Sequence, residues 1–267
     1  MNINELLSSP NYKSEYNLIL NSFIHEYDIS KANINALLSR GVIDKSTYDN
    51  LYNSDKAIRE KTVGLMIRKD PNIYKEIQHG IMDAKYQLIT TNFIEPEDII
   101  CIKNDAVFVK KKLEYTTFGL MDFKLKNTYT VFAKINRYEF YYYFNSYNGE
   151  EKLDVKGISD NKLIIHKEYF MDFLLALFNT LQTDGIISAV NIIQNFSLAY
   201  IRKELPIEYY RKFNSESNFD IIHGNEIWST INATDINLID IRFNYEILRD
   251  LYGLLMSYYF KKVKGWL

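Results

Sequence analysis

The chain has 267 residues, of which 47% are apolar and 25% are charged, and its formal net charge at pH 7 is −2. This length and apolar content predict one large core or two small fused ones, and they exclude a disordered tail. The near-neutral charge disfavours a protein whose only task is to coat nucleic acid, because phosphate binding depends on clustered Lys and Arg.

The composition also bears on compartment and origin. Cys101 is the single cysteine, so this chain alone cannot build a disulfide framework or a thiolate zinc site. We find no signal-like N-terminal segment and no apolar run of the roughly 20 residues that a membrane helix needs, so we expect a cytoplasmic protein with no membrane partner. The abundance of Asn, Ile, Lys and Tyr resembles proteins of AT-rich genomes, such as those of some bacteriophages and mobile elements.

The first third of the chain is predicted to contain one strand followed by helices. Apolar residues within 18–28 predict a strand that ends near Asp28. The apolar spacing that follows predicts helices over 31–40, 44–51, 55–68 and 71–91. Gly41 suits the C-terminal cap of the first helix, and Asp70 can cap the last one, which would begin near Pro71.

The pattern changes after residue 92. Apolar runs at 99–102 and 106–109 flank a short polar segment and predict a β-hairpin with Asn104-Asp105 in its turn. Further extended segments are predicted at 116–123, 128–135, 138–144 and 152–155, and helices at 168–183, 186–202 and 245–262. The predicted fold class is therefore α+β: an antiparallel sheet with a helical insertion and a C-terminal helical segment.

Two carboxylates are candidate metal ligands. Asp28 lies at the end of a predicted strand, where its backbone is fixed and its side chain stays accessible, although it could also cap the next helix. Asp105 lies in the hairpin turn, although an Asn-Asp pair also suits a turn with unusual backbone angles. If the two strands are neighbours, the carboxylates would meet as two-metal phosphoryl transfer requires.

A second candidate group lies on the helix predicted over 55–68. Lys56 and Arg59 are three residues apart, so both side chains can point at one triphosphate. The alternative is a surface ion pair between Lys56 and Glu60, one turn apart. Gly64 inside the same helix costs roughly 1 kcal/mol relative to Ala, which favours a close approach of backbone or base at that point.

Residues 103–134 contain seven lysines against three acidic residues. Lys110, Lys111 and Lys112 beside the hairpin, with Lys124 and Lys126 on the following strands, could track a phosphate backbone, or they could simply form a solvated hairpin end. The aromatic segment 138–144 could stack bases or fill a core. The four histidines show no metal-type spacing.

Five segments, in order along the chain, resemble motifs of the family B DNA polymerases. Asp28-Ile-Ser-Lys-Ala-Asn-Ile resembles the first palm motif, Asp-x-Ser-x-x-x-apolar, and residues 56–64 resemble the fingers motif Lys-x-x-x-Asn-Ser-x-Tyr-Gly. Asn104-Asp105-Ala-Val-Phe-Val is similar to the palm hairpin Asp-Thr-Asp-Ser-Val-Phe-Val. Lys126-Asn-Thr-Tyr129 resembles the Lys-x-Tyr element, and Lys156-Gly157 resembles the Lys-Gly that opens the thumb.

The resemblance implies a minimal, template-directed polymerase encoded by a phage or a similar element. Residues 1–160 would form a palm-like core with small fingers at about 29–92, and residues 161–267 would form a thumb-like segment. Mg²⁺ or Mn²⁺ would bind to Asp28 and Asp105. The nucleoside triphosphate would contact Lys56, Arg59 and Gly64. Primer and template would contact Lys110, Lys111, Lys112, Lys124, Lys126, Tyr129, Lys156 and Gly157.

The chain departs from the family pattern at functional positions. Lys103 stands where the palm hairpin would have its first Asp, if Asp105 is aligned with the second. Alternatively, Asp105 takes the first position, and Ala106 and Val107 replace the rest. Glu60, Lys61 and Val63 replace the Asn, Ser and Tyr of the fingers motif. The alternative function is therefore a non-catalytic, polymerase-like interaction protein in a phage replication, transcription or virion complex.

Overall fold

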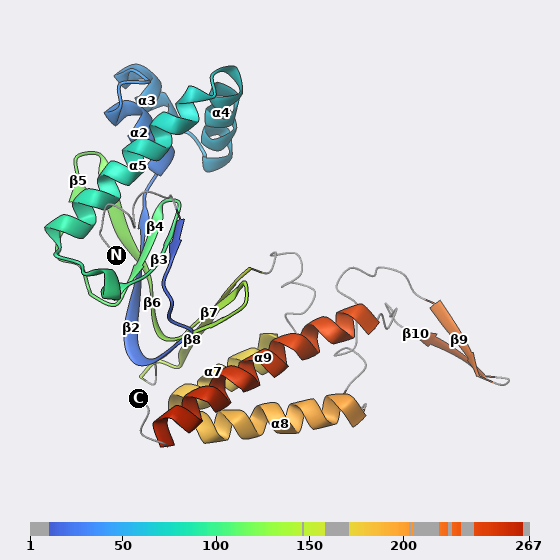
Figure 1. Ribbon diagram of the computed structural model, residues 1–267. Coiled ribbons are helices and arrows are strands. Elements are labelled where there is room, and N and C mark those ends of the chain that lie inside the picture. The colour runs from blue at the N-terminus through green and yellow to red at the C-terminus, as the bar shows by residue number, and fades with distance from the viewer. Residues whose placement is uncertain are drawn as a thin grey trace. The chain divides into compact units, whose positions relative to one another are not determined.

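The structure is a computed structural model, and it describes residues 11–145, 147–157, 171–202, 204–205, 219–223, 226–230 and 238–263. Within these residues the fold is α+β, with an eight-stranded antiparallel sheet, a separate two-stranded hairpin, a helical insertion and C-terminal helices (Figure 1). The predicted fold class is confirmed. None of the helices in this part of the chain is long and apolar enough to cross a bilayer.

The strands follow the order β1-β3-β4-β2-β6-β7-β8 across the sheet, and β5 pairs with β6. Their bounds are β1 (Asn11–Lys13), β2 (Leu18–Ile29), β3 (Ile99–Lys103), β4 (Ala106–Val109), β5 (Thr117–Phe118), β6 (Met121–Ile135), β7 (Tyr138–Asn145) and β8 (Glu150–Lys156), while β9 (Phe219–His223) pairs with β10 (Glu226–Thr230). The helices are α2 (Ala32–Ser39), α3 (Lys45–Tyr52), α4 (Lys56–Lys69), α5 (Asn72–Thr91), α7 (Asp172–Thr183), α8 (Ile186–Arg202) and α9 (Leu238–Val263), with a short 3₁₀ turn at Pro96–Asp98.

The chain divides into two compact units. Unit 1 comprises residues 1–16 and 22–128, and unit 2 comprises residues 17–21 and 129–267. Strands β2 and β6 therefore each contribute residues to both units. The division after residue 128 differs from the boundary expected near 160, because β7 and β8 share a core with the C-terminal helices.

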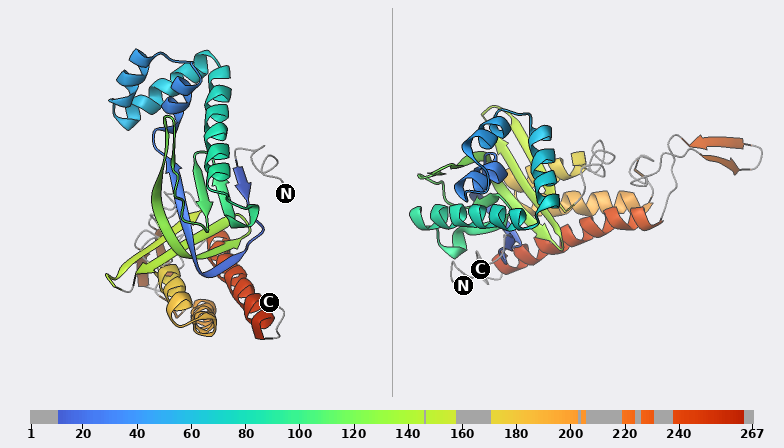
Figure 2. Two further views of the ribbon diagram at one scale, coloured as in Figure 1. Left: turned by 90° about the vertical axis from the view of Figure 1, so that its left-hand side faces the viewer. Right: turned by 90° about the horizontal axis from the view of Figure 1, so that it is seen from above.

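The core of unit 1 lies between its strands and helices α2 to α5, which gather at the end of the strands where β2 finishes (Figures 1 and 2). Helices α2 and α5 approach closely at Gly80, where an added Cβ would lie 2.9 Å from the Cβ of Ala36. Fully buried aliphatic side chains such as Ile34 and Leu88 fill the space between these helices and the sheet. This packing fixes the helical insertion that follows Asp28.

The core of unit 2 is built from β6 to β8 and from α7, α8 and α9. The rings of Phe140 and Tyr142 stack with Phe178 of α7 at centroid distances of 5.5 and 6.1 Å. Residues 138–142 are all buried. The aromatic segment of β7 therefore fills a core, which was the alternative to base stacking.

Most predicted elements agree with the structure to within one or two residues. Gly41 adopts a left-handed backbone (φ 69°) after α2, and the Asp70 carboxylate accepts a hydrogen bond from the Asn72 amide at 2.9 Å at the start of α5. Two predicted strands, 116–123 and 128–135, are instead the short β5 and one 15-residue strand, β6. Strand β1 and the β9–β10 hairpin were not predicted, and the beginning of the helix predicted from residue 168 lies outside the described residues.

Candidate functional site

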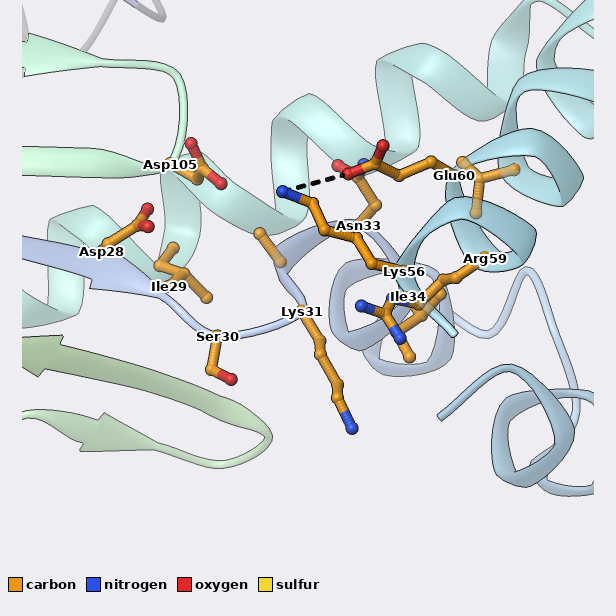
Figure 3. A pocket seen from close by; sticks show the side chains of 12 residues that line it. Asp28, Ile29, Ser30, Lys31, Asn33, Ile34, Lys56, Arg59, Glu60 and Asp105 are labelled. Atoms are coloured by element: carbon orange, nitrogen blue, oxygen red, sulfur yellow. Dashed lines mark ion pairs between the residues drawn. The ribbon is translucent and has the colours of Figure 1, made fainter. Parts of the chain in front are cut away.

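The pairing of β2 with β4 brings Asp28 and Asp105 together. Asp28 lies opposite Ala106 in the sheet register, and the amide of Ile29 donates to the carbonyl oxygen of Asp105 at 3.1 Å. Figure 3 shows the two carboxyl groups side by side at the ends of their strands. Two acidic residues 77 positions apart in the chain therefore meet at one point of unit 1.

Asp28 does not have the capping role that was its alternative interpretation, whereas the Asn-Asp turn does contain an unusual backbone angle, at Asn104. The N-cap of α2 is Lys31, at φ 54°, and no side chain caps this helix, so Asp28 is not a cap. In the hairpin turn it is Asn104 that takes the left-handed backbone, at φ 46°. Asn is one of the few residues that tolerate this conformation, so the turn does not depend on the Asp105 side chain.

Both carboxylates line a cavity of about 380 Å³ together with the predicted triphosphate-binding residues. One wall carries Asp28 and Asp105, and the opposite wall carries Lys56, Arg59 and Glu60 of α4. The remaining lining residues come from the last residue of β2, the two residues that link β2 to α2, the first turn of α2 and α4: Ile29, Ser30, Lys31, Ala32, Asn33, Ile34 and Val63. The cavity thus places acidic and basic groups on facing walls.

The basic side chains of the cavity have partners of their own. The Lys56 ammonium group lies 3.6 Å from a carboxylate oxygen of Glu60, so the ion pair considered as the alternative is present, although both side chains are well exposed. In Figure 3 the Lys56 side chain extends toward the wall that carries Asp105, whereas Lys31 extends away from it. Arg59 donates from Nη1 to the carbonyl oxygen of Ser54 at 3.0 Å.

The electrostatics of Asp28 favour a cation nearby. Burial, and then the charge of Asp105, raises the pKa of the Asp28 carboxyl group, while Lys126 opposes this rise. The Lys126 ammonium group lies 3.7 Å from Asp28 Oδ2 and 3.9 Å from the buried Glu26. Among the residues that the structure describes, no group of three or more His, Cys, Asp or Glu side chains could hold a metal ion.

One residue of the site was missed by the sequence analysis. Lys85 of α5 is fully buried, and its ammonium group donates to the carbonyl oxygen of Asn104 at 2.6 Å, beside Asp105. Burial lowers the pKa of Lys85 to about 8, with Asp105 acting in the opposite direction. A signal was present, because Lys85 lies on the same helix face as the buried residues Ile81 and Leu88.

The buried amine makes a testable contribution to pH-dependent stability. Since the pKa of Lys85 is about 8 in the folded protein and 10.5 when unfolded, the unfolded chain binds more protons between these values. The free energy of unfolding of the wild type, relative to Lys85→Met, should therefore rise by roughly 2 kcal/mol from about pH 7.5 to pH 10. Urea unfolding of both proteins across this range measures the difference, and parallel pH profiles would contradict the assignment.

The other predicted site residues of unit 1 are scattered. Lys110 lies 3.7 Å from Asp98, and Lys111 donates to the carbonyl oxygen of Asn92 at 2.8 Å, so both have structural contacts. Lys112 is exposed. The burial of His25 lowers the pKa of that residue, and the positive charge of Lys112 lowers it further. Lys124 is exposed and lies 3.9 Å from Asp122, and Gly64 is not among the cavity's lining residues.

Three predicted residues belong to unit 2. The Tyr129 side chain is fully buried and its hydroxyl group donates to the Asp154 carboxylate, so its ring packs inside the protein. Gly157 has φ 94°, and an added Cβ would lie 2.5 Å from the carbonyl oxygen of Arg137. The backbone conformation and the close contact therefore explain why a glycine stands at this position. Lys156, at the end of β8, is partly exposed.

Comparison with known proteins points to one family. A family model described as Bacteriophage PBS1 gene 130 protein matches residues 1–251. No curated protein matches the chain.

Proposed function

The chain belongs to the bacteriophage PBS1 gene 130 protein family, and we propose that it is a minimal palm-type nucleotidyltransferase that extends a primer on a nucleic-acid template in the host cytoplasm. The observation that carries this proposal is that the Asp28 and Asp105 carboxylates line the same cavity as Lys56 and Arg59. Asp28, Asp105 and the Lys56/Arg59 pair come from three separate segments of the chain. Phosphoryl transfer uses this combination, because basic groups stabilise the charge that develops on phosphate oxygens and carboxylates can hold a divalent cation.

The donor set of the cavity fits a hard divalent cation. Carboxylate oxygens are the ligands that Mg²⁺ and Mn²⁺ prefer, and Mg²⁺ is commonly held by one or two carboxylates together with substrate phosphates and water. Asp28 and Asp105 would hold the ion, and their mutual repulsion would fall when it binds. The bound ion would lower the pKa of the attacking hydroxyl group and neutralise charge on the triphosphate.

The residues of α4 would bind the triphosphate. Lys56 is 80% exposed and paired only loosely with Glu60, so it can exchange this partner for a phosphate oxygen at little cost. Arg59 lines the same wall one turn along the helix and offers a planar, permanently charged group. Lys126, beside Asp28 and 56% exposed, is the best-placed lysine for a primer phosphate next to the site.

Primer extension tests the proposal. The full-length protein is incubated with primed DNA or RNA templates, labelled nucleotides, and Mg²⁺ or Mn²⁺. We expect extension, and we expect Lys56→Ala to raise the KM for nucleotide by about tenfold or more, because a charge-assisted contact contributes about 1.5–3 kcal/mol. Lys45→Ala is the matched control, since Lys45 is similarly exposed and paired with Asp49 but does not line the cavity.

One observation favours the alternative, a non-catalytic polymerase-like protein in a phage replication or transcription complex. The charge of Asp28 is already partly balanced by Lys126 at 3.7 Å, so the site can persist without a metal ion. In that case the protein would bind primed template without extending it under any of these conditions, and Lys56→Ala would change nothing measurable.

A further inference from the structure

Helix α4 lines the cavity with one side only. Lys56, Arg59, Glu60 and Val63 line the cavity. At 100° per residue, the opposite side of the helix carries Ile58, Lys61, Leu65, Arg68 and Lys69, which we call the outer face of α4. All five of these residues are exposed.

The outer face is both apolar and basic. Ile58 and Leu65 are 55% and 47% exposed, and they lie seven residues apart, or about 10 Å along the axis. Lys61, Arg68 and Lys69 flank them, and no acidic residue of α4 shares this side. None of the three forms an ion pair with any residue in the described part of the chain. Helix α4 thus presents two exposed apolar side chains among three basic groups on its outer face.

We propose that the outer face of α4 binds an acidic amphipathic helix of a partner protein. Apolar side chains on one stripe of such a helix would cover Ile58 and Leu65, and flanking Asp or Glu residues would meet Lys61, Arg68 and Lys69. Residues 58–69 span about 16 Å, or three turns, so the partner segment would be about 12 residues long. Charge complementarity would speed association and orient the segment.

A nucleic acid fits this face less well. Single strands are bound by stacking bases on aromatic rings, and the outer face has none. A phosphate backbone would use the three basic side chains but would leave Ile58 and Leu65 exposed to water. The face is also turned away from the cavity-lining side of α4, so this interaction does not depend on the proposed nucleotide chemistry.

The probe is a labelled peptide of about 15 residues with Leu at positions i, i+3, i+4 and i+7 and Glu at most others. A scrambled peptide of the same composition is the control ligand, and fluorescence anisotropy with the full-length protein gives the Kd. We expect the ordered peptide to bind about tenfold or more tightly than the scrambled one, with weaker binding at high salt.

Two pairs of substitutions separate the apolar and charged contributions. Ile58→Ser with Leu65→Ser, and Lys61→Glu with Lys69→Glu, should each weaken binding by about tenfold or more. The matched controls are Tyr86→Ser and Lys75→Glu on α5, which remove an exposed ring and reverse an exposed charge elsewhere in unit 1 and should change the Kd by less than about twofold.

Three outcomes would overturn the proposal. The ordered peptide could fail to bind, it could bind no better than the scrambled one, or the serine pair could leave its affinity unchanged. Competition with a duplex DNA oligonucleotide adds a further arm. If the DNA binds the wild type and the serine pair equally but loses affinity for the glutamate pair, the outer face is a phosphate site instead.

Discussion

Replacing Asp28 with Asn is expected to abolish nucleotide incorporation while making the protein more stable. Loss of one carboxylate ligand should lower the rate of extension by about a thousandfold or more, since metal-assisted charge stabilisation contributes several kcal/mol. Stability should change in the opposite direction because the pKa of Asp28 is raised by burial and by Asp105. A raised pKa means that the ionised carboxylate is less favourable in the folded protein than in the unfolded chain.

The sign of this effect fixes its pH dependence. The folded state binds the Asp28 proton more tightly than the unfolded state does, so stability falls as the pH rises from the ordinary Asp pKa to the raised one, and the loss is complete above the raised pKa. The Tm of Asp28→Asn should therefore exceed that of the wild type at neutral pH, and the gap should close as the pH falls toward the ordinary Asp pKa of about 4. Differential scanning calorimetry between about pH 3.5 and pH 7.5 measures the gap.

A matched set of variants separates catalysis from folding. Asp105→Asn should lose extension to a similar degree, because it removes the second carboxylate of the same pair. Asp83→Asn is the control, since Asp83 is 66% exposed and contacts Arg40 outside the cavity. Extension that survives in both Asp28→Asn and Asp105→Asn would end the catalytic proposal, whatever happens to the Tm.

Gly80→Ala is expected to lower the free energy of unfolding by about 1–3 kcal/mol, although alanine is the better helix former. The added Cβ would lie 2.9 Å from Ala36 Cβ and 3.1 Å from Ala36 Cα, and the second of these contacts is with backbone. Helix α2 or α5 must therefore shift. Because the first turn of α2 itself lines the cavity, the same shift should weaken nucleotide binding.

Gly64→Ala on α4 is the matched control for Gly80→Ala. An added Cβ at Gly64 meets no atom within 4 Å, so only the helix propensity changes. The free energy of unfolding of this variant should be about 0.5–1 kcal/mol higher than that of the wild type. Urea unfolding of the two variants measures both changes in the free energy of unfolding, a decrease for Gly80→Ala and an increase for Gly64→Ala. A loss of stability in Gly64→Ala would restore the sequence-based expectation that something approaches the backbone there.

The sequence was sufficient to predict an element where the spacing of its apolar residues and the turn or capping residues at its ends agreed. The β3–β4 hairpin follows from two apolar runs around Asn104-Asp105, and the helices of unit 1 follow from apolar spacing with Gly41 and Asp70 near their ends. The meeting of Asp28 with Asp105 needed one further assumption, that β2 neighbours the hairpin. In the structure β2 does pair with β4 of the hairpin.

Long-range contacts could not be predicted in the same way. The proximity of Lys126 to Asp28 depends on where β6 runs, and its polar stretch 124–128 resembles a break between strands because these residues are exposed or half-buried. Lys85 lies on the apolar face of its predicted helix, but the sequence does not show that the carbonyl oxygen of Asn104 accepts a hydrogen bond from its side chain. The burial of Tyr129 likewise depends on a partner, Asp154, on another strand.

The short segment 17–21 limits how far this protein can be trimmed. It belongs to unit 2 although unit 1 flanks it on both sides. The Lys134 amide donates to the carbonyl oxygen of Asn17 at 2.8 Å, and Leu18 and Leu20 pack against the unit 2 core. A fragment ending at residue 128 would expose both leucines and an unsatisfied strand edge, which is a template for aggregation. A truncated variant should therefore keep the C-terminal half, or segment 17–21 should be redesigned in it.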